Sequence, residues 1–267
     1  MKNLLKGGVK SVFSMLGIEL SRKRKIDQPK PPKFGNPLNA YEALIREISK
    51  NKETLEFVII GANDGANNDP GYPIIKNYIS KKSNVMLFEP NTWLIPKIEE
   101  SYSFHPSKHI CNEAIGGGDK LHLYVVKEEF WPALQPNYAA GWPIYRAPLG
   151  ITSGDPDRVK EWVRRVGKGA VDPDVAVMEI EVAFTELLPA RQKRGLEPEI
   201  DVLQIDAEGF DDEVIAHSNI EATRPKLIRF ESAFLTPERV GHVRDLLGDR
   251  YAIYDVGEDA LCLRIGA

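Results

Sequence analysis

The feature that most constrains the fold is a series of short apolar runs that alternate with segments of helical pattern. Four of these runs, rich in Val, Ile, Leu and Phe, cover residues 56–60, 85–88, 201–206 and 226–230. They lack the regular polar alternation of a strand with one face in water, so we expect strands that are buried on both faces. Such strands, separated by helices, predict a sheet with helices on both sides.

Further elements complete this pattern. A shorter strand is predicted at residues 109–111, and the strands 251–255 and 261–265 are joined by Gly257-Glu258-Asp259, a hairpin signal. Together the elements predict an α/β fold: a doubly wound, Rossmann-like sheet of seven strands with a C-terminal antiparallel hairpin. Apolar spacing, capping residues and prolines predict helices over about 40–49, 73–81, 92–102, 211–217 and 236–248.

Residues 127–176 interrupt the alternation. They follow a further predicted strand at 121–126 and contain three of the four tryptophans of the chain, with several tyrosines and prolines. A segment this long without regular structure is unusual in a compact domain, and its aromatic content argues against disorder. We therefore predict an aromatic-rich insertion, with a short helix over 155–166, that packs over the strand ends.

The chain divides into a basic head and an acidic body. Residues 1–33 hold nine Lys and Arg against two acids, whereas the remainder holds 26 Lys and Arg against 37 acids. Residues 1–25 gather apolar side chains on one helical face, and the Pro- and Lys-rich segment that follows has the composition of a linker. This head fits an amphipathic helix that contacts an anionic membrane or a partner. It also fits a helix packed on its own domain, or a frayed tail.

Composition excludes several classes of protein. No run of 18 apolar residues predicts a transmembrane helix, and no cleavage site for a signal peptide follows the head. Two cysteines, Cys111 and Cys262, are too few for a disulfide framework, so a reduced cytoplasmic chain is the simpler interpretation. The acidic body argues against nucleic-acid binding, which needs a basic face.

Ligands of doubly wound sheets bind at the carboxyl ends of the strands, so the residues that follow each strand are candidates for a site. After the first strand, Gly61, Asn63, Asp64 and Gly65 form a loop whose glycines allow a sharp turn and a close approach to a ligand. Glu89 follows the second strand, 24 positions after Gly65, where a carboxylate can accept hydrogen bonds from both hydroxyls of a ribose. Each feature also has a structural interpretation, as an ordinary turn and as a helix-capping acid.

The later strands are followed by two more polar groups. Glu113 and Ala114 come after the third strand, where a small residue leaves room for a flat base, or where the chain simply turns. Asp206 and Glu208 bracket one residue after the fourth strand. Carboxylates there can meet an ammonium group, act as a base or bind a cation, although acids also favour helix N-termini for structural reasons. Asp206, inside an apolar strand, favours function, whereas the two interpretations of Glu208 are balanced.

In this order the four motifs resemble those of class I S-adenosylmethionine-dependent methyltransferases and, more narrowly, the FkbM family. The resemblance spans about residues 55–235, leaves out 1–54 and covers the insertion only loosely; a methyltransferase domain over 34–267 follows from it. At Gln204 many relatives have Lys, a departure that points to a different acceptor or mechanism. The motifs that carry the resemblance are 58–65, 88–91, 112–116 and 200–209, the last being the most specific because the family reads close to I-D-x-E-G there.

The resemblance implies binding of S-adenosylmethionine and methyl transfer to an oxygen, often of a sugar or natural product. The acceptor is therefore expected to be a small molecule or a glycan. The cofactor-binding positions that it implies are Gly61, Asn63, Asp64 and Gly65 for the methionine end, Glu89 for the ribose, Glu113 and Ala114 for the adenine, and Asp206 for the amino group or the acceptor.

An alcohol is a poor nucleophile until its proton is removed, so a carboxylate base is expected: Asp206 or Glu208, with Glu231 as a third candidate. The five histidines show no metal-ligand spacing, and no metal is predicted. Two alternatives are an NAD-dependent oxidoreductase, which the missing third glycine and the terminal hairpin disfavour, and a catalytically silent binding protein of the same fold. The expected location is the cytoplasm, and the amphipathic-helix interpretation of residues 1–25 adds peripheral contact with the inner face of the membrane.

Overall fold

The computed structural model describes residues 37–118 and 120–265. The basic head predicted at 1–33, with its membrane-contacting helix at 1–25, lies outside the described residues and stays a prediction. None of the helices in the described ranges is long and apolar enough to cross a bilayer. Cys111 and Cys262 are both buried and free.

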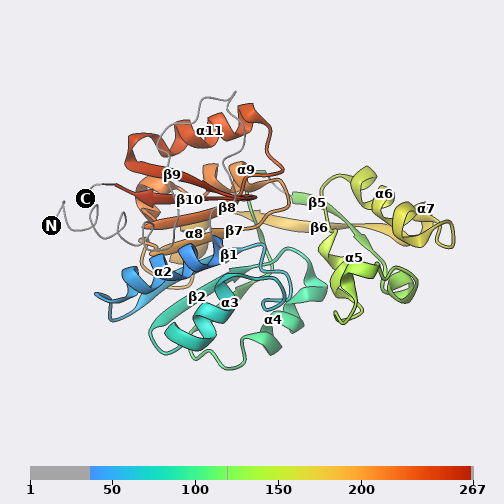
Figure 1. The fold of residues 1–267 in the computed structure, drawn as a ribbon, viewed down its shortest axis with the longest axis horizontal. Coiled ribbons are helices and arrows are strands. Elements are labelled where there is room, and N and C mark those ends of the chain that lie inside the picture. Colours follow the sequence, from blue (N-terminus) through green and yellow to red (C-terminus); the bar gives the residue numbers. More distant parts are fainter. Residues whose placement is uncertain (1–36, 119, 266–267) are drawn as a thin grey trace.

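A seven-stranded sheet forms the centre of the molecule (Figure 1). Its strand order is β3-β2-β1-β7-β8-β10-β9, and β10 runs antiparallel to both of its neighbours. This arrangement confirms the predicted doubly wound sheet with a C-terminal antiparallel hairpin. The strands are β1 (Leu55–Ile60), β2 (Ser83–Phe88), β3 (Lys108–Cys111), β7 (Val202–Ile205), β8 (Leu227–Glu231), β9 (Tyr251–Val256) and β10 (Asp259–Arg264).

The register of the central strands brings their carboxyl ends to one level. Ile60 of β1 lies beside Phe88 of β2 on one side and beside Ile205 of β7 on the other. Because these strands are parallel, the loops that follow them leave the sheet at the same edge. The strand order reverses between β1 and β7, and ligands of such sheets bind at this reversal.

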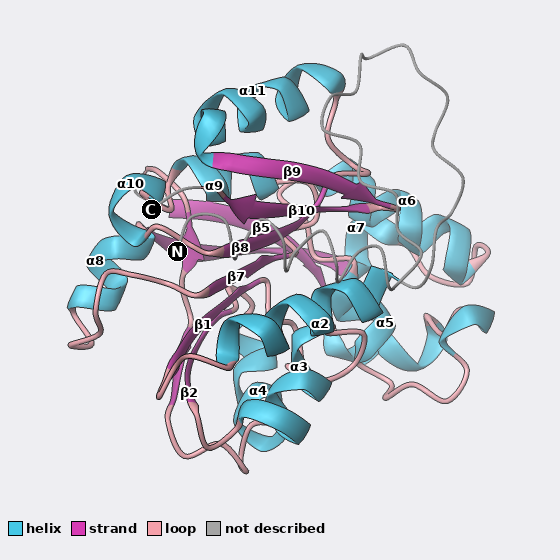
Figure 2. Ribbon diagram, turned by 60° about the vertical axis from the view of Figure 1, so that its left-hand side comes forward, coloured by secondary structure: helices cyan, strands magenta, loops and turns pink. Residues whose placement is uncertain are grey.

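Helices cover both faces of the sheet (Figure 2). The predicted helix at 73–81 is divided into a short α-helix and a π-helical turn. One face carries α2 (Pro37–Ser49), α3 (Gly71–Ile74), the π-helical turn η1 (Ile75–Ile79) and α4 (Ile95–Ser101), which η2 (Thr92–Leu94) precedes. The other face carries α8 (Leu187–Gln192), α9 (Asp211–Ala216), α10 (Ile220–Thr223) and α11 (Pro237–Leu247), which η5 (Gly248–Arg250) follows.

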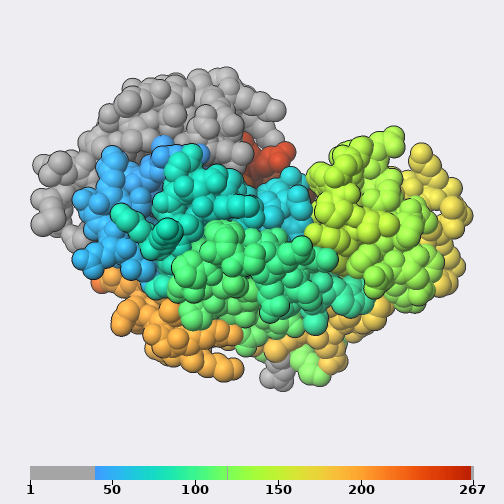
Figure 3. Space-filling model, turned by 90° about the horizontal axis from the view of Figure 1, so that it is seen from below, coloured from blue at the N-terminus to red at the C-terminus, as the bar shows by residue number. Residues whose placement is uncertain are grey.

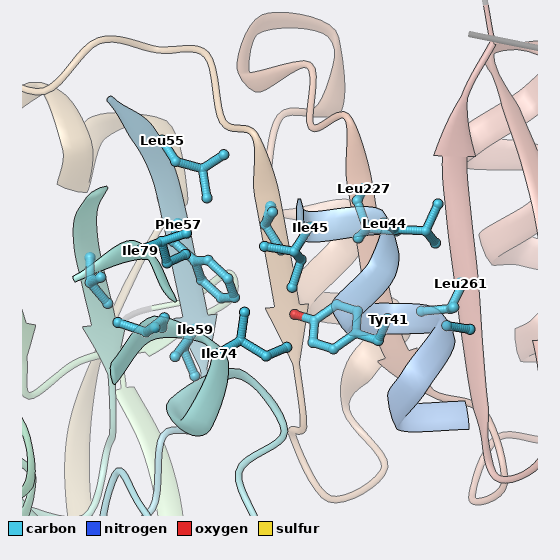
Figure 4. Close-up of a cluster of buried hydrophobic side chains, with 14 of the residues drawn as sticks. Tyr41, Leu44, Ile45, Leu55, Phe57, Ile59, Ile74, Ile79, Leu227 and Leu261 are labelled. Carbon is cyan, nitrogen blue, oxygen red and sulfur yellow. The ribbon is translucent and has the colours of Figure 1, made fainter. Parts of the chain in front are cut away.

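Alternate residues of β1 belong to two hydrophobic clusters, one on each face of the sheet. Phe57 and Ile59 pack in the cluster that includes Tyr41 of α2 (Figure 4). Val58 and Ile60 pack in the cluster beneath α9 and α11. Burial on both faces explains why β1 is a continuous apolar run, and each such side chain stabilises the fold by about 1.5–3 kcal/mol.

Residues 120–185 form a second structural unit, here called the arm, which lies at one end of the molecule (Figures 1 and 3). Its long strands β5 (Lys120–Val126) and β6 (Val177–Thr185) pair antiparallel, and β4 (Ala114–Ile115) pairs with β6. The strand predicted at 121–126 is therefore present, but it pairs outside the seven-stranded sheet. Its partner β6 was not predicted.

Between β5 and β6 the chain folds around a small core of its own. The helix predicted at 155–166 is α6, which begins where Asp155 accepts a hydrogen bond from the backbone N–H of Asp157 (2.9 Å). Trp162 and Val163 of α6 pack in a cluster separate from the two clusters of the sheet. The helices of the arm are η3 (Glu128–Ala133), η4 (Asn137–Ala139), α5 (Arg146–Gly150), α6 (Pro156–Gly167) and α7 (Pro173–Ala176).

Candidate active site

The loop after β1 turns sharply at Gly61, whose φ is 79°; Gly65 also has a positive φ, 78°. A Cβ atom added at Gly61 would lie 1.9 Å from the backbone oxygen of Asp206, so only glycine allows β1 to approach the end of β7 this closely. The backbone N–H groups of Gly61 and Ala62 both donate to the carbonyl oxygen of Phe88, at 3.0 Å each. Backbone contacts therefore hold the ends of β1, β2 and β7 together.

Asn63 and Asp64 organise the rest of this loop. The backbone N–H of Asn63 donates to Oε2 of Glu89 (2.8 Å), which ties the loop to the acid after β2. The Asp64 carboxylate is buried and accepts hydrogen bonds from the backbone N–H groups of Ala66 and Asn67 and from Nδ2 of Asn67, at 2.7–3.0 Å. The structure thus places Asp64 inside the loop, where its oxygens stabilise the turn.

Glu89 lies at the end of β2 and is only 6% exposed. Its two carboxylate oxygens accept hydrogen bonds from the backbone N–H groups of Asn63 and Asn91, at 2.8 Å each. Burial raises the pKa of Glu89 from 4.5 to about 7, against the opposing effect of these two donors. The hydroxyls of a ribose would add donors that stabilise the ionised form, so the environment suits the predicted role.

The loop after β3 is joined to the loop after β2. Nδ2 of Asn112 donates to the backbone oxygen of Glu89 (2.9 Å). The predicted adenine-binding residues Glu113 and Ala114 follow it. Ala114 is buried at the start of β4, while the Glu113 carboxylate pairs with Arg194 (3.2 Å), beyond α8. The backbone of this loop is therefore at the site edge, but the Glu113 carboxylate is bound to a group outside the four motifs.

Asp206 and Glu208 stand two positions apart but differ in environment. The Asp206 carboxylate is partly buried and accepts no hydrogen bond from a side chain of the described residues. Burial raises its pKa, whereas Arg229 and Arg146 lower it. Glu208, with a φ of 50°, is held twice by Arg158: Nη2 donates to its Oε2 (2.7 Å) and Nη1 to its backbone oxygen (2.9 Å). Asp206 is thus available to accept a proton, whereas the Glu208 carboxylate forms an ion pair with Arg158.

More carboxyl groups lie around the end of β8. Oδ1 of Asp211 accepts a hydrogen bond from the backbone N–H of Glu231 (3.0 Å), while its buried Oδ2 has no partner. Burial, together with the charge of Asp206, raises the pKa of Asp211 to about 7 and that of Glu231 to about 8. Glu231 therefore holds a proton at neutral pH. Arg229 pairs nearby with Asp259 of β10 (2.7 Å).

The arm contributes side chains to this edge that sequence reasoning did not identify. Oη of Tyr145 lies 3.4 Å from Oδ2 of Asp64, and Nη2 of Arg146 donates to the backbone oxygen of Asn67 (3.0 Å). Arg158 on α6 is the partner of the loop after β7. No spacing in the sequence distinguishes these residues from the other polar residues of the insertion, so only the folded arrangement identifies them.

Gln204, where the sequence departs from the family pattern, lies within β7. Its Oε1 accepts a hydrogen bond from Oη of Tyr41 (3.0 Å), and its Nε2 donates to Oδ1 of Asp69 (3.1 Å). Asp69 also accepts hydrogen bonds from the backbone of Gly71 and Tyr72 at the start of α3, and burial raises its pKa. The amide of Gln204 therefore links the sheet to α2 and to the loop before α3.

Within 37–118 and 120–265, no three His, Cys, Asp or Glu side chains are grouped so as to hold a metal ion. Two surface hollows, one lined by Glu99 and Lys108 and one beside α9 and α10, include none of the strand-end residues described above. The candidate site is therefore defined by the loops and charges that converge at the carboxyl edge of the sheet.

Comparisons with known proteins identify a family that this chain matches. Residues 60–255 match the family model of the methyltransferase FkbM domain. Similar solved structures include the METTL16 MTase domain (TM-score 0.44, 12% identity, 97% of this chain and 78% of that chain) and the O-methyltransferase NovP (0.40, 12%, 98% and 98%). The Methanococcus jannaschii fibrillarin pre-rRNA processing protein is also similar (0.39, 12%, 92% and 87%). No curated protein matches the sequence.

Proposed function

This chain belongs to the FkbM family of methyltransferases, and we propose that it uses S-adenosylmethionine to methylate a hydroxyl group of a sugar or natural product. The observation that carries the proposal is the Asp206 carboxylate. It is partly buried, its pKa is raised by burial, and it lies where β7 ends beside the Gly61 loop. A carboxylate there can take a proton from a hydroxyl held next to a cofactor.

The residues at the strand ends fit S-adenosylmethionine. Glu89 presents a carboxylate suited to two ribose hydroxyls, and Gly61 and Gly65 keep the loop free of side chains that would hold a ligand away. The ionised Asp206 carboxylate suits a ligand with a positive sulfonium and an ammonium group, because opposite charges attract strongly in a partly buried site. When bound, this cofactor supplies a methyl group on a positive sulfur that needs no further activation.

Three carboxyl groups are candidates for the base, and the differences between their environments support one of them. Arg158 compensates the charge of Glu208 through a direct ion pair. Glu231, with a pKa of about 8, already carries a proton at neutral pH. Asp206 remains, and the positive charges of Arg229 and Arg146 help to keep it ionised. We assign to Asp206 the task of accepting the hydroxyl proton at a carboxylate oxygen.

Exposed aromatic rings support a sugar as the acceptor. Phe210, which follows the β7 motif, is 43% exposed, and Phe234, which follows β8, is 54% exposed. The guanidinium of Arg158 lies 5.1 Å from the centroid of the Phe234 ring. Large exposed rings beside a site offer flat apolar faces on which one side of a sugar ring can stack.

The test is the variant Asp206→Asn. Its turnover should fall at least ~100-fold, because an amide cannot act as a base. Its affinity for S-adenosylhomocysteine, measured by calorimetry, should fall much less than its turnover, because Glu89 and the Gly61 loop still contact the rest of the ligand. Turnover is followed by mass spectrometry across a panel of sugars and glycans, in which the product gains one methylene unit.

Glu208→Gln is the matched control, because the amide retains a hydrogen bond to Arg158 and the residue is not the proposed base. Its turnover should fall much less than that of Asp206→Asn. Full activity of Asp206→Asn would remove Asp206 from the mechanism. A wild-type protein that binds neither S-adenosylmethionine nor its demethylated product would overturn the assignment of the cofactor.

A further inference from the structure

Arg146, at the start of α5 in the arm, is an arginine whose hydrogen bonds are incomplete. Its side chain is only 12% exposed, and its Nε is buried without a hydrogen-bond partner. Nη2 donates to the backbone oxygen of Asn67 (3.0 Å). Its ion-pair partner Asp64 lies 3.7 Å from Nε, which is too long for a hydrogen bond. A buried donor without an acceptor is costly, so this guanidinium has capacity for a further ligand.

The position of Arg146 is fixed on several sides. Gly150, one turn later in α5, leaves room for the guanidinium, because a Cβ atom there would lie 2.8 Å from Nη1. The ring of Trp142 lies 5.5 Å from the guanidinium carbon. The oxygens of Asp64 already accept hydrogen bonds from Ala66 and Asn67. Arg146 is therefore held beside the loop after β1, while Asp64 is already occupied within that loop.

Its charge also acts on the other strand-end acids. Arg146 lowers the pKa of Glu89, of Asp206 and of Glu208, although it hydrogen-bonds none of them. The charge of Arg146 thus acts on acids that follow both β2 and β7, and its guanidinium lies beside the loop after β1. This is the region that would surround the amino-acid end of a cofactor whose ribose is held by Glu89.

We propose that Arg146 binds the carboxylate of the amino-acid portion of S-adenosylmethionine, so that the arm supplies the cation that recognises this end of the cofactor. The inference rests on the proposed function. Arg146 is a cation with an unpartnered donor and lies near Asp64, Glu89 and Asp206. The two oxygens of a carboxylate match the donors of a guanidinium group. Binding would add an acceptor to the incompletely bonded guanidinium and would couple the position of the arm to the presence of the cofactor.

The other arginines near the sheet are less suited to this role. Arg158 gives its two terminal nitrogens to Glu208, and Arg229 pairs with Asp259. Arg191 also has an unpartnered nitrogen, but it bonds to Glu56 near the start of β1, at the opposite end of that strand. Arg146 is thus the arginine whose incomplete hydrogen bonding and position both fit the amino-acid end of the cofactor.

The experiment compares two ligands by calorimetry. S-adenosylhomocysteine carries the amino-acid carboxylate, whereas 5′-methylthioadenosine lacks the whole amino-acid portion. Arg146→Met should weaken binding of S-adenosylhomocysteine about 10- to 100-fold, the usual cost of a lost hydrogen bond to a charged group. Its affinity for 5′-methylthioadenosine should be unchanged. Arg165→Met, which removes an exposed arginine of α6, is the matched control and should leave both affinities unchanged.

The outcomes separate this inference from the proposed function. A wild type that binds neither ligand overturns the proposed function itself. Equal weakening of both ligands by Arg146→Met overturns the inference and leaves Arg146 as a structural clamp of the Asn67 loop. Circular dichroism and the melting temperature show whether the variant is folded.

A second measurement needs no variant. The wild type should bind decarboxylated S-adenosylmethionine at least ~10-fold more weakly than the intact cofactor, because the hydrogen-bonded carboxylate is missing. Equal affinities would overturn the inference even if Arg146→Met does not fold. Where that variant folds, it should lose the discrimination between these two forms.

Discussion

The sheet and the arm position their residues of the candidate site in different ways. At the sheet edge the backbone does so: the N–H of Gly61 donates to the oxygen of Phe88, so the loop moves only if the strands move. The arm instead uses the long side chains of Arg146 and Arg158, which extend from α5 and α6. The loops after β1 and β2 are therefore fixed by the fold, whereas the contribution of the arm depends on the separate core that positions its helices.

The two regions also differ in the environment of their acids. At the sheet edge, burial raises the pKa of Glu89 to about 7 and that of Glu231 to about 8. On the surface of the arm, an ion pair with Lys120 lowers the pKa of Glu181. The sheet edge thus disfavours negative charge until a ligand compensates it, whereas the arm stabilises its own surface charges.

Truncation of a buried side chain in each core should give the largest losses of stability. It tests whether the sheet and the arm unfold independently. Phe57→Ala should lower the free energy of unfolding by about 3–5 kcal/mol, because the ring is fully buried in the cluster of the sheet. Trp162→Ala should remove a similar amount from the arm alone, whose cluster is distinct. Hydrogen exchange followed by mass spectrometry should then show faster exchange within 120–185 for Trp162→Ala, with β1, β2 and β7 still protected.

Val175→Ala is the control for this pair, because Val175 lies in the arm but is 50% exposed. It should change stability by less than about 0.5 kcal/mol. If Trp162→Ala accelerates exchange in the central strands as much as in the arm, the two regions unfold together and the contrast fails.

The same contrast decides how much of the fold could be predicted. β1 and β2 are buried on both faces, so their apolar runs are typical of central strands. In β6, Glu179 and Glu181 alternate with apolar residues, a pattern that fits a strand with one wet face but does not reveal its partner. That partner, β5, is separated from it by the helices of the arm, and the pairing depends on how the insertion folds. The sequence therefore predicted the seven-stranded sheet and strand β5 of the arm, but not its partner strand β6.

A similar limit applies to the candidate site. Gly61, Glu89 and Asp206 could be proposed because each follows a strand, and parallel strands bring such positions to one edge. Arg146 and Arg158 could not, because a position in an insertion does not show where a flexible guanidinium will reach. Asp64 shows a further limit: its place in the loop was predictable, but the use of its oxygens within the turn was not.

Substitution of two glycines with positive φ by alanine should give the next largest loss of stability. A Cβ atom at Gly61 would collide with the backbone of Asp206, whereas one at Gly141 in the arm would meet nothing within 4 Å. Gly61→Ala should therefore lower the free energy of unfolding by roughly 3 kcal/mol or more. Gly141→Ala should lower it by only about 1–2 kcal/mol, because alanine is strained in the left-handed backbone conformation. Urea denaturation measures both, and equal losses would show that the end of β7 can shift to admit a side chain.

The smallest of these effects concerns pH and uses Glu89 at the sheet edge. The carboxyl group has a pKa of 4.5 when unfolded and about 7 in the fold, so the folded chain retains a proton that the unfolded chain loses between these values. This contribution to stability is fully present below pH 4.5 and is lost as pH rises through about 7. Glu89→Gln removes the ionisation. The free energy of unfolding of the variant, measured by urea denaturation relative to that of the wild type, should therefore rise by about 1–3 kcal/mol from pH 5 to pH 8.

Glu181→Gln in the arm is the control with the opposite sign. Lys120 lowers the pKa of Glu181, so its ionised form favours the fold above pH 4.5 and that contribution is lost on acidification. Between pH 5 and pH 8 Glu181 stays ionised in both the folded and the unfolded chain, and the difference between this variant and the wild type should not change. A constant difference for Glu89→Gln as well would mean that water reaches Glu89 in solution, and the electrostatic contrast between the sheet edge and the arm would then be lost.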